Sequence, residues 1–191
     1  MLRFRPPGQL PFLNVQPTII DEAKLRLRTF YRIFPEKVSK GKNQTPTLNW
    51  LYTRCADGKQ VVTPRDVLDL VTRAVQKEQD ICATGSSASS DYIISPAALK
   101  YGLEELSKRK RETYLQAEFP HLWPAIERFA GGKTEYNEAA IAKVCGGDWQ
   151  KTIDDLVSIG LFSKKKTRDG NTIYWVPYLY RQSLELTQGK A

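Results

Sequence analysis

Residues 134–176 read TEYNEAAIAKVCGGDWQKTIDDLVSIGLFSKKKTRDGNTIYWV, and this stretch decides the fold. Asn137 is suited to cap a helix, because its side-chain oxygen can accept a hydrogen bond from a free backbone N–H group. The helix that follows would bury one face made of Ala140, Ile141 and Val144. Cys145-Gly146-Gly147 then predicts a tight turn between two crossed helices.

The next helix is predicted to begin at its capping residue, Asp148, and to end at Gly160. Its apolar residues recur at helical spacing and define a buried face: Trp149, Ile153, Leu156 and Val157. The opposite, outer face carries Gln150, Lys151, Asp154, Asp155 and Ser158. This helix should therefore pack on one side and present mixed charge on the other.

A basic hairpin is predicted directly after this helix. Residues 161–166 and 171–176 read as strands, and they flank Thr167-Arg168-Asp169-Gly170, in which Asp-Gly favours a tight turn. A short helix is predicted before the stretch as well, with apolar residues Leu122, Trp123, Ile126 and Phe129 and with Gly131-Gly132 at its end.

Three short helices followed by a basic hairpin resemble a winged helix-turn-helix module. The phrase Leu-Val-Ser-Ile-Gly-Leu-Phe, residues 156–162, is similar to the junction between the third helix and the wing of such modules. The resemblance implies a mainly α protein with two small helical modules, the second a winged helix-turn-helix with a β-hairpin wing. It implies a binding module and not a catalytic centre.

The remaining sequence divides at stretches that cannot form a core. Residues 1–17 are rich in proline and predict an extended arm or linker, and residues 18–80 predict a helical module that could itself be of winged-helix type. Residues 81–94 are mostly small and polar and predict a flexible linker. Residues 95–191 would hold a long helix, ending by Pro120, and then the winged-helix module.

Two phrases resemble the C-terminal region of large, poorly characterised bacterial P-loop ATPases. The first is Ile33-Phe34-Pro35-Glu36-Lys37-Val38 with Trp50, Arg54 and Asp57-Gly58, and the second is Thr63-Pro64-Arg65-Asp66. The resemblance implies an ATPase domain upstream, which these residues do not contain, and a role for this chain in binding or sensing a partner. Gly132-Lys133-Thr134 does not make a P-loop, because Glu127 stands where that motif needs a glycine.

Composition narrows the class of function. The net charge is +8, and residues 1–60 hold eleven Lys and Arg against four acidic residues, which indicates either an anionic partner or a charged surface that only keeps the protein soluble. No signal peptide or membrane-spanning run is evident, so a cytoplasmic protein is expected, with Cys55, Cys82 and Cys145 as reduced thiols. His121 is the sole histidine, and no catalytic constellation can be assembled, so we expect no enzyme activity, cofactor or metal.

The expected function is nucleic-acid binding, with DNA as the favoured partner. The candidate phosphate-binding residues are the wing cations Lys164, Lys165, Lys166 and Arg168, with Lys151 and the basic stripe Lys24, Arg28 and Arg32. Asp154 and Asp155 oppose deep base reading by the third helix, because both would face phosphates. The alternative is a protein-interaction or regulatory module that contacts an ATPase or another protein.

Overall fold

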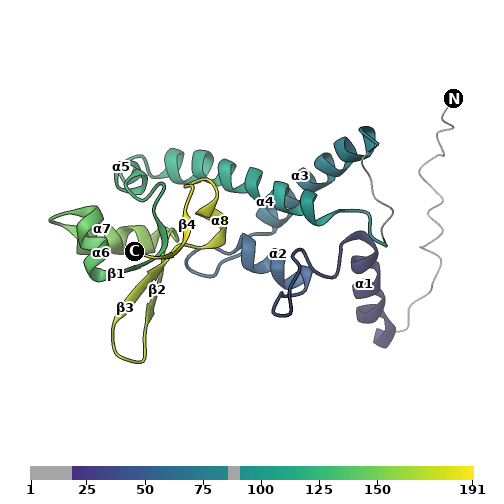
Figure 1. Cartoon of the computed structure of the whole chain (residues 1–191), viewed down its shortest axis with the longest axis horizontal. Helices are drawn as coiled ribbons and strands as arrows, with labels where there is room; N and C mark the ends of the chain where they lie inside the picture. The colour runs from purple at the N-terminus through teal and green to yellow at the C-terminus, as the bar shows by residue number, and fades with distance from the viewer. Residues whose placement is uncertain (1–18, 86–90) are drawn as a thin grey trace.

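The computed structural model describes residues 19–85 and 91–191, and the side chains from residue 22 onward within these ranges. The protein is mainly α-helical, with one four-stranded sheet near one end of its long axis (Figure 1). The expected N-terminal arm, residues 1–17, lies outside the described residues, as does the middle of the expected linker.

The N-terminal part consists of three helices, α1 (Ile19–Ile33), α2 (Thr47–Cys55) and α3 (Pro64–Ala83). The Thr63 hydroxyl accepts a hydrogen bond from the Asp66 amide at 3.1 Å, and Pro64 occupies the first helical turn, so this local sequence caps and starts α3. Figure 1 shows α1 projecting at one end of the molecule. Its C-terminal end is anchored by the buried residue Phe34.

Helix α4 (Pro96–Lys110) is capped by Ser95, whose hydroxyl accepts a hydrogen bond from the Ala98 amide. It packs closely along α3: a Cβ atom placed on Gly102 would lie 2.4 Å from the carbonyl oxygen of Leu70. The sequence predicted one long helix, but from Arg111 to Gln116 the chain continues as the π-helical segment η1. Tyr114 in this segment donates a hydrogen bond to the Ile159 carbonyl at 3.2 Å, which ties the widened turn to the C-terminal part.

The C-terminal part places its helices and strands in an alternating order. It contains α5 (Trp123–Glu127), β1 (Lys133–Asn137), α6 (Glu138–Cys145), α7 (Trp149–Ser158), β2 (Ser163–Lys166), β3 (Thr172–Trp175), α8 (Tyr178–Arg181) and β4 (Thr187–Lys190). The strand order is β2-β3-β1-β4; β3 is antiparallel to both neighbours, and β4 is parallel to β1. The expected helix pair and hairpin are therefore present, and Asn137 caps α6 through a 2.8 Å bond from the Ala140 amide.

Two strands of the sheet were not predicted. In strand β1 buried and less buried residues alternate, with Thr134 and Tyr136 pointing into the core. This short strand directly follows Gly131-Gly132, a pair that was interpreted only as a helix end. Strand β4 has no apolar residue, and it forms because β1 offers a free edge. Asp148, expected as a cap, occupies the N-cap position of α7 but its side chain makes no capping hydrogen bond.

One hydrophobic core runs through both parts of the chain. Its buried residues come from the N-terminal helices, from α4 and from the C-terminal part, for example Trp50, Leu70, Leu106, Phe162 and Tyr180. The expected linker, residues 81–94, thus separates α3 and α4, two helices that pack against each other. Its first residues, 81–83, are helical, and Ile94 is buried with its amide bonded to the Ile33 carbonyl at 2.8 Å.

The three cysteines differ in accessibility, and this predicts their reactivity. Cys82 is exposed, whereas Cys55 and Cys145 are buried, and burial raises the pKa of Cys55 to about 12 and also raises the pKa of Cys145. With Ellman's reagent at pH 8, we expect one thiol to react rapidly in the native protein and two more only after unfolding. Rapid reaction of a native Cys82→Ser variant would contradict this packing.

Candidate nucleic-acid interface

The hairpin of β2 and β3 divides the wing cations between its two faces. Lys164 lies opposite Tyr174 and Lys166 opposite Thr172, whereas Lys165 lies opposite Ile173. Cross-strand partners share a face, and successive residues alternate. Because Tyr174 is buried against the core, Lys164 and Lys166 lie on the helix-facing side of the hairpin and Lys165 lies on the opposite side.

Lys164 is occupied by contacts within the protein. Its Nζ atom lies 3.6 Å from Oδ1 of Asp154 on α7 and 5.7 Å from the centroid of the Tyr174 ring. The negative charge of ionised Tyr174, followed by that of Asp154, raises the pKa of Lys164. Since both charged side chains are exposed, this pair contributes little to stability, but it neutralises part of the positive charge at the base of the hairpin.

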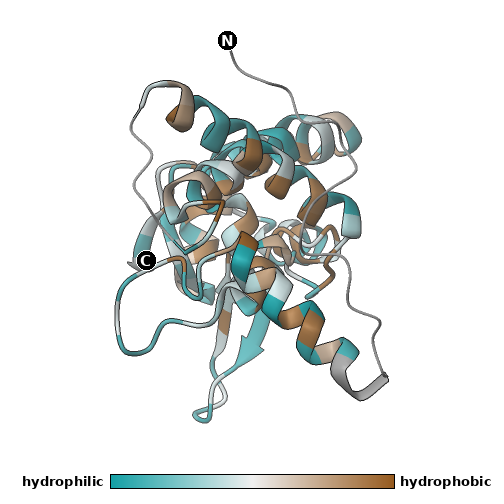
Figure 2. Cartoon of the chain, turned by 90° about the vertical axis from the view of Figure 1, so that its right-hand side faces the viewer, coloured by the Kyte–Doolittle hydropathy of each residue, from teal (hydrophilic) through white to brown (hydrophobic). Residues whose placement is uncertain are grey.

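The other three wing cations remain available. The side chains of Lys165, Lys166 and Arg168 are exposed. Within residues 22–85 and 91–191, no carboxylate oxygen lies within 4.0 Å of their charged nitrogen atoms. Arg168 stands in the turn held by a hydrogen bond from the Thr167 amide to the Asn171 carbonyl at 2.8 Å. The hairpin projects from the body of the protein (Figures 1 and 2). The hairpin therefore presents three positive charges to solvent, with the exposed carboxylate of Asp169 in the same turn as Arg168.

The outer face of α7 is electrostatically mixed, as expected. Lys151 and Asp154 are exposed, and Asp155 is half-buried. Asp154 directs its charge towards the hairpin through Lys164, so the carboxylate and the wing share one surface. A polyanion that approached α7 along its length would meet both carboxylates.

The expected basic stripe on α1 lies far from the wing. Lys24, Arg28 and Arg32 are all exposed, but α1 and the hairpin lie towards opposite ends of the long axis (Figure 1). The structure therefore brings Lys151 and the wing cations to one end of the molecule and separates the α1 cations from them. The eight candidate residues form two surfaces and not one.

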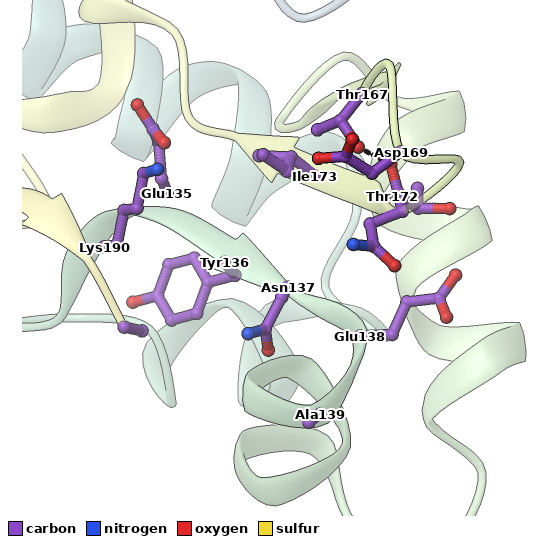
Figure 3. A pocket seen from close by; sticks show the side chains of 12 residues that line it. Glu135, Tyr136, Asn137, Glu138, Ala139, Thr167, Asp169, Thr172, Ile173 and Lys190 are labelled. Atoms are coloured by element: carbon purple, nitrogen blue, oxygen red, sulfur yellow. Dashed lines mark hydrogen bonds between the residues drawn. The ribbon is translucent and has the colours of Figure 1, made fainter.

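A hollow of about 500 Å³ lies between the hairpin and the start of α6 (Figure 3). Its lining includes three carboxylates, Glu135, Glu138 and Asp169, and one amine, that of Lys190. Figure 3 shows these side chains coming from β1, the start of α6, the hairpin turn and β4. This hollow could not be predicted from the sequence, because its lining depends on the pairing of β4 with β1. An anion would meet net negative charge on this side of the hairpin.

Comparisons with known proteins add no relative: no family model, no curated protein and no solved structure matches the chain. Within residues 19–85 and 91–191, no cluster of His, Cys, Asp and Glu could hold a metal ion. No helix in the same ranges has the length and apolar character needed to cross a membrane.

Proposed function

We propose that residues 123–175 form a winged helix-turn-helix module. The order α5-β1-α6-α7-β2-β3 supports this proposal, because it places a strand between the first and second helices and a hairpin after the third. The pairing of β1 with β3, in a sheet whose next strand is β2, supports it too. In this interpretation α7 is the third helix and the β2–β3 hairpin is the wing.

The module binds nucleic acid, most simply duplex DNA, through the wing. The observation that carries this proposal is the exposed group of Lys165, Lys166 and Arg168, which have no carboxylate partner among the described residues. Phosphate contacts by such side chains release counterions and require no base recognition. Asp154 and Asp155 disfavour insertion of α7 into the major groove, so binding should tolerate changes of sequence.

Fluorescence anisotropy with labelled duplex and single-stranded DNA over a salt series tests the wing. Changing Lys165, Lys166 and Arg168 together to alanine should weaken binding and lower the slope of log K against log salt by about three, about one per phosphate contact. A separate Lys164→Ala change should have a smaller effect, because Asp154 already neutralises that amine.

A control of equal charge change uses three exposed lysines away from the wing, Lys40, Lys42 and Lys100, each changed to alanine. This control should retain the wild-type slope. Equal loss in both triple variants would mean that net charge alone drives binding, and absence of binding at low salt would remove the nucleic-acid proposal.

A second candidate function is binding of a protein partner, which the acidic side chains around the hairpin support. Asp154 is exposed, and the hollow beside the hairpin carries three carboxylates, so a partner with a basic surface would be accommodated there. The resemblance to bacterial P-loop ATPases suggests an ATPase domain as that partner. A complex with a basic protein that is lost on Glu138→Lys but kept in the wing triple variant would favour this function, because such a contact depends on the acidic hollow and not on the wing cations.

A further inference from the structure

A ladder of arginine and aromatic side chains lies outside the wing, where α2, the end of β3 and α8 meet. The Cζ atom of Arg54 lies 3.5 Å from the centroid of the Tyr178 ring, and that of Arg181 lies 4.0 Å from the same centroid. Both guanidinium groups therefore contact the ring of Tyr178.

The ladder continues from Arg181 to Trp175. The Cζ atom of Arg181 lies 4.6 Å from the Trp175 ring, and the rings of Trp175 and Tyr178 are nearly perpendicular with centroids 5.5 Å apart. Arg181 therefore sits in the corner between the two rings, where its Nε atom donates a hydrogen bond to the Val176 carbonyl at 2.9 Å. Stacking of this kind fixes the plane of a guanidinium group and leaves its edge N–H groups to donate hydrogen bonds. One such group of Arg54, on Nη1, donates to the Thr53 hydroxyl at 3.1 Å.

The two arginines have no matching negative charge close by. No carboxylate among the described side chains lies within 4.0 Å of either guanidinium group, and Glu135 acts on Arg181 only from a greater distance. Arg181 is 9% exposed, and Arg54 is half-buried. Burial lowers the pKa of both arginines, and the positive charge of Arg54 further lowers the pKa of Arg181. Two partly desolvated like charges without a counterion are costly to hold together.

We propose that Arg54 and Arg181, held in place by Tyr178 and Trp175, form a binding site for an oxyanion of the phosphate class. Their Cζ atoms are separated by no more than the sum of their distances to the Tyr178 centroid, about 7.5 Å. A tetrahedral oxyanion at the rim of the ring can therefore accept N–H···O bonds of about 2.8 Å from both guanidinium groups. This site does not depend on nucleic-acid binding by the wing.

The phosphate group has two sources that share this chemistry, a small free phosphate and the backbone of a nucleic acid.

Arg54 comes from α2 and the other three residues from the C-terminal part, so an anion bound here would also join the two parts of the chain. A ligand that binds only the folded state raises the melting temperature by linkage, which provides the measurement.

Thermal unfolding should be followed with increasing inorganic phosphate or pyrophosphate, at ionic strength matched with sodium chloride. We expect both ions to raise the melting temperature of the wild type and affinity to fall at least about tenfold in Arg54→Gln and in Arg181→Gln. Arg65→Gln removes the same charge at an exposed position and should behave as the wild type. Unspecific stabilisation by phosphate would raise the melting temperature equally in all four proteins, and that result would overturn the proposal.

Two further arms complete the test. Should a glutamine variant fail to fold, Arg54→Lys keeps the charge but loses the planar fork, and its affinity should still fall about tenfold. A short single-stranded oligonucleotide, tested with the wing triple variant, distinguishes the source of the phosphate group. If the oligonucleotide binds only when Arg54 is present and free phosphate does not bind, the ligand is a backbone phosphodiester. No Arg54-dependent binding of any of these probes would overturn the site.

Discussion

Phe162→Ala is expected to lower the free energy of unfolding by about 4 kcal/mol. Phe162 is fully buried, and its ring meets those of Phe129 and Tyr136 edge to face, with centroids 5.0 and 6.1 Å away. Removing the ring leaves a cavity between α5, β1 and the segment after α7, and it also removes the aromatic contacts, worth about 1 kcal/mol each. Urea denaturation followed by circular dichroism measures the loss.

Two variants calibrate this result. Phe162→Leu keeps most of the volume and should cost about 1.5 kcal/mol. Tyr52→Ala removes an aromatic ring that is 58% exposed and should change stability by no more than about 0.5 kcal/mol. A loss below about 1 kcal/mol for Phe162→Ala would show that the three rings do not form the centre of this part of the core.

Gly58→Ala is expected to lower the free energy of unfolding by about 3 kcal/mol. The added Cβ atom would lie 2.3 Å from the carbonyl oxygen of Phe162 and 2.7 Å from that of Gly160, and both are backbone atoms that cannot rotate away. The backbone of Gly58 donates to the Gly160 carbonyl at 2.6 Å and accepts from the Ser163 hydroxyl at 2.8 Å. Separation of these groups would detach the N-terminal helices from the start of the β2–β3 hairpin.

Gly147→Ala is the matched control, because a Cβ atom there meets no atom within 4 Å. Neither glycine adopts a positive φ angle, so the two substitutions differ in available space and not in backbone preference. The control should be neutral or slightly stabilising. Chemical denaturation of both proteins makes the comparison, and equal stability of the two variants would contradict the close approach at Gly58.

Several features of the fold follow from local sequence alone. Thr63, Ser95 and Asn137 were recognisable as helix caps, because a side-chain oxygen next to a free amide needs no distant partner. The hairpin was recognisable from Asp169-Gly170 between two strand-like runs, and α7 from the spacing of its apolar residues. The mainly α class of the protein followed from these elements.

The candidate sites were accessible to sequence analysis only in part. The wing cations could be predicted to be exposed, because Lys165 and Lys166 belong to an edge strand and Arg168 to its turn. That Lys164 is neutralised by Asp154 could not be predicted, because the pair joins two elements whose orientation depends on packing.

Tertiary structure decided every feature that joins segments distant in the chain. Strand β4 has no strand-forming pattern, and it pairs with β1 because folding brings a free row of backbone groups to it. Asp57-Gly58 is a pair typical of a local turn, yet Gly58 packs against residues more than a hundred positions later. Arg54 contacts Tyr178, which is also more than a hundred positions away in the sequence. Periodicity and capping act within a few residues, whereas these contacts exist only once the shared core has brought both parts of the chain together.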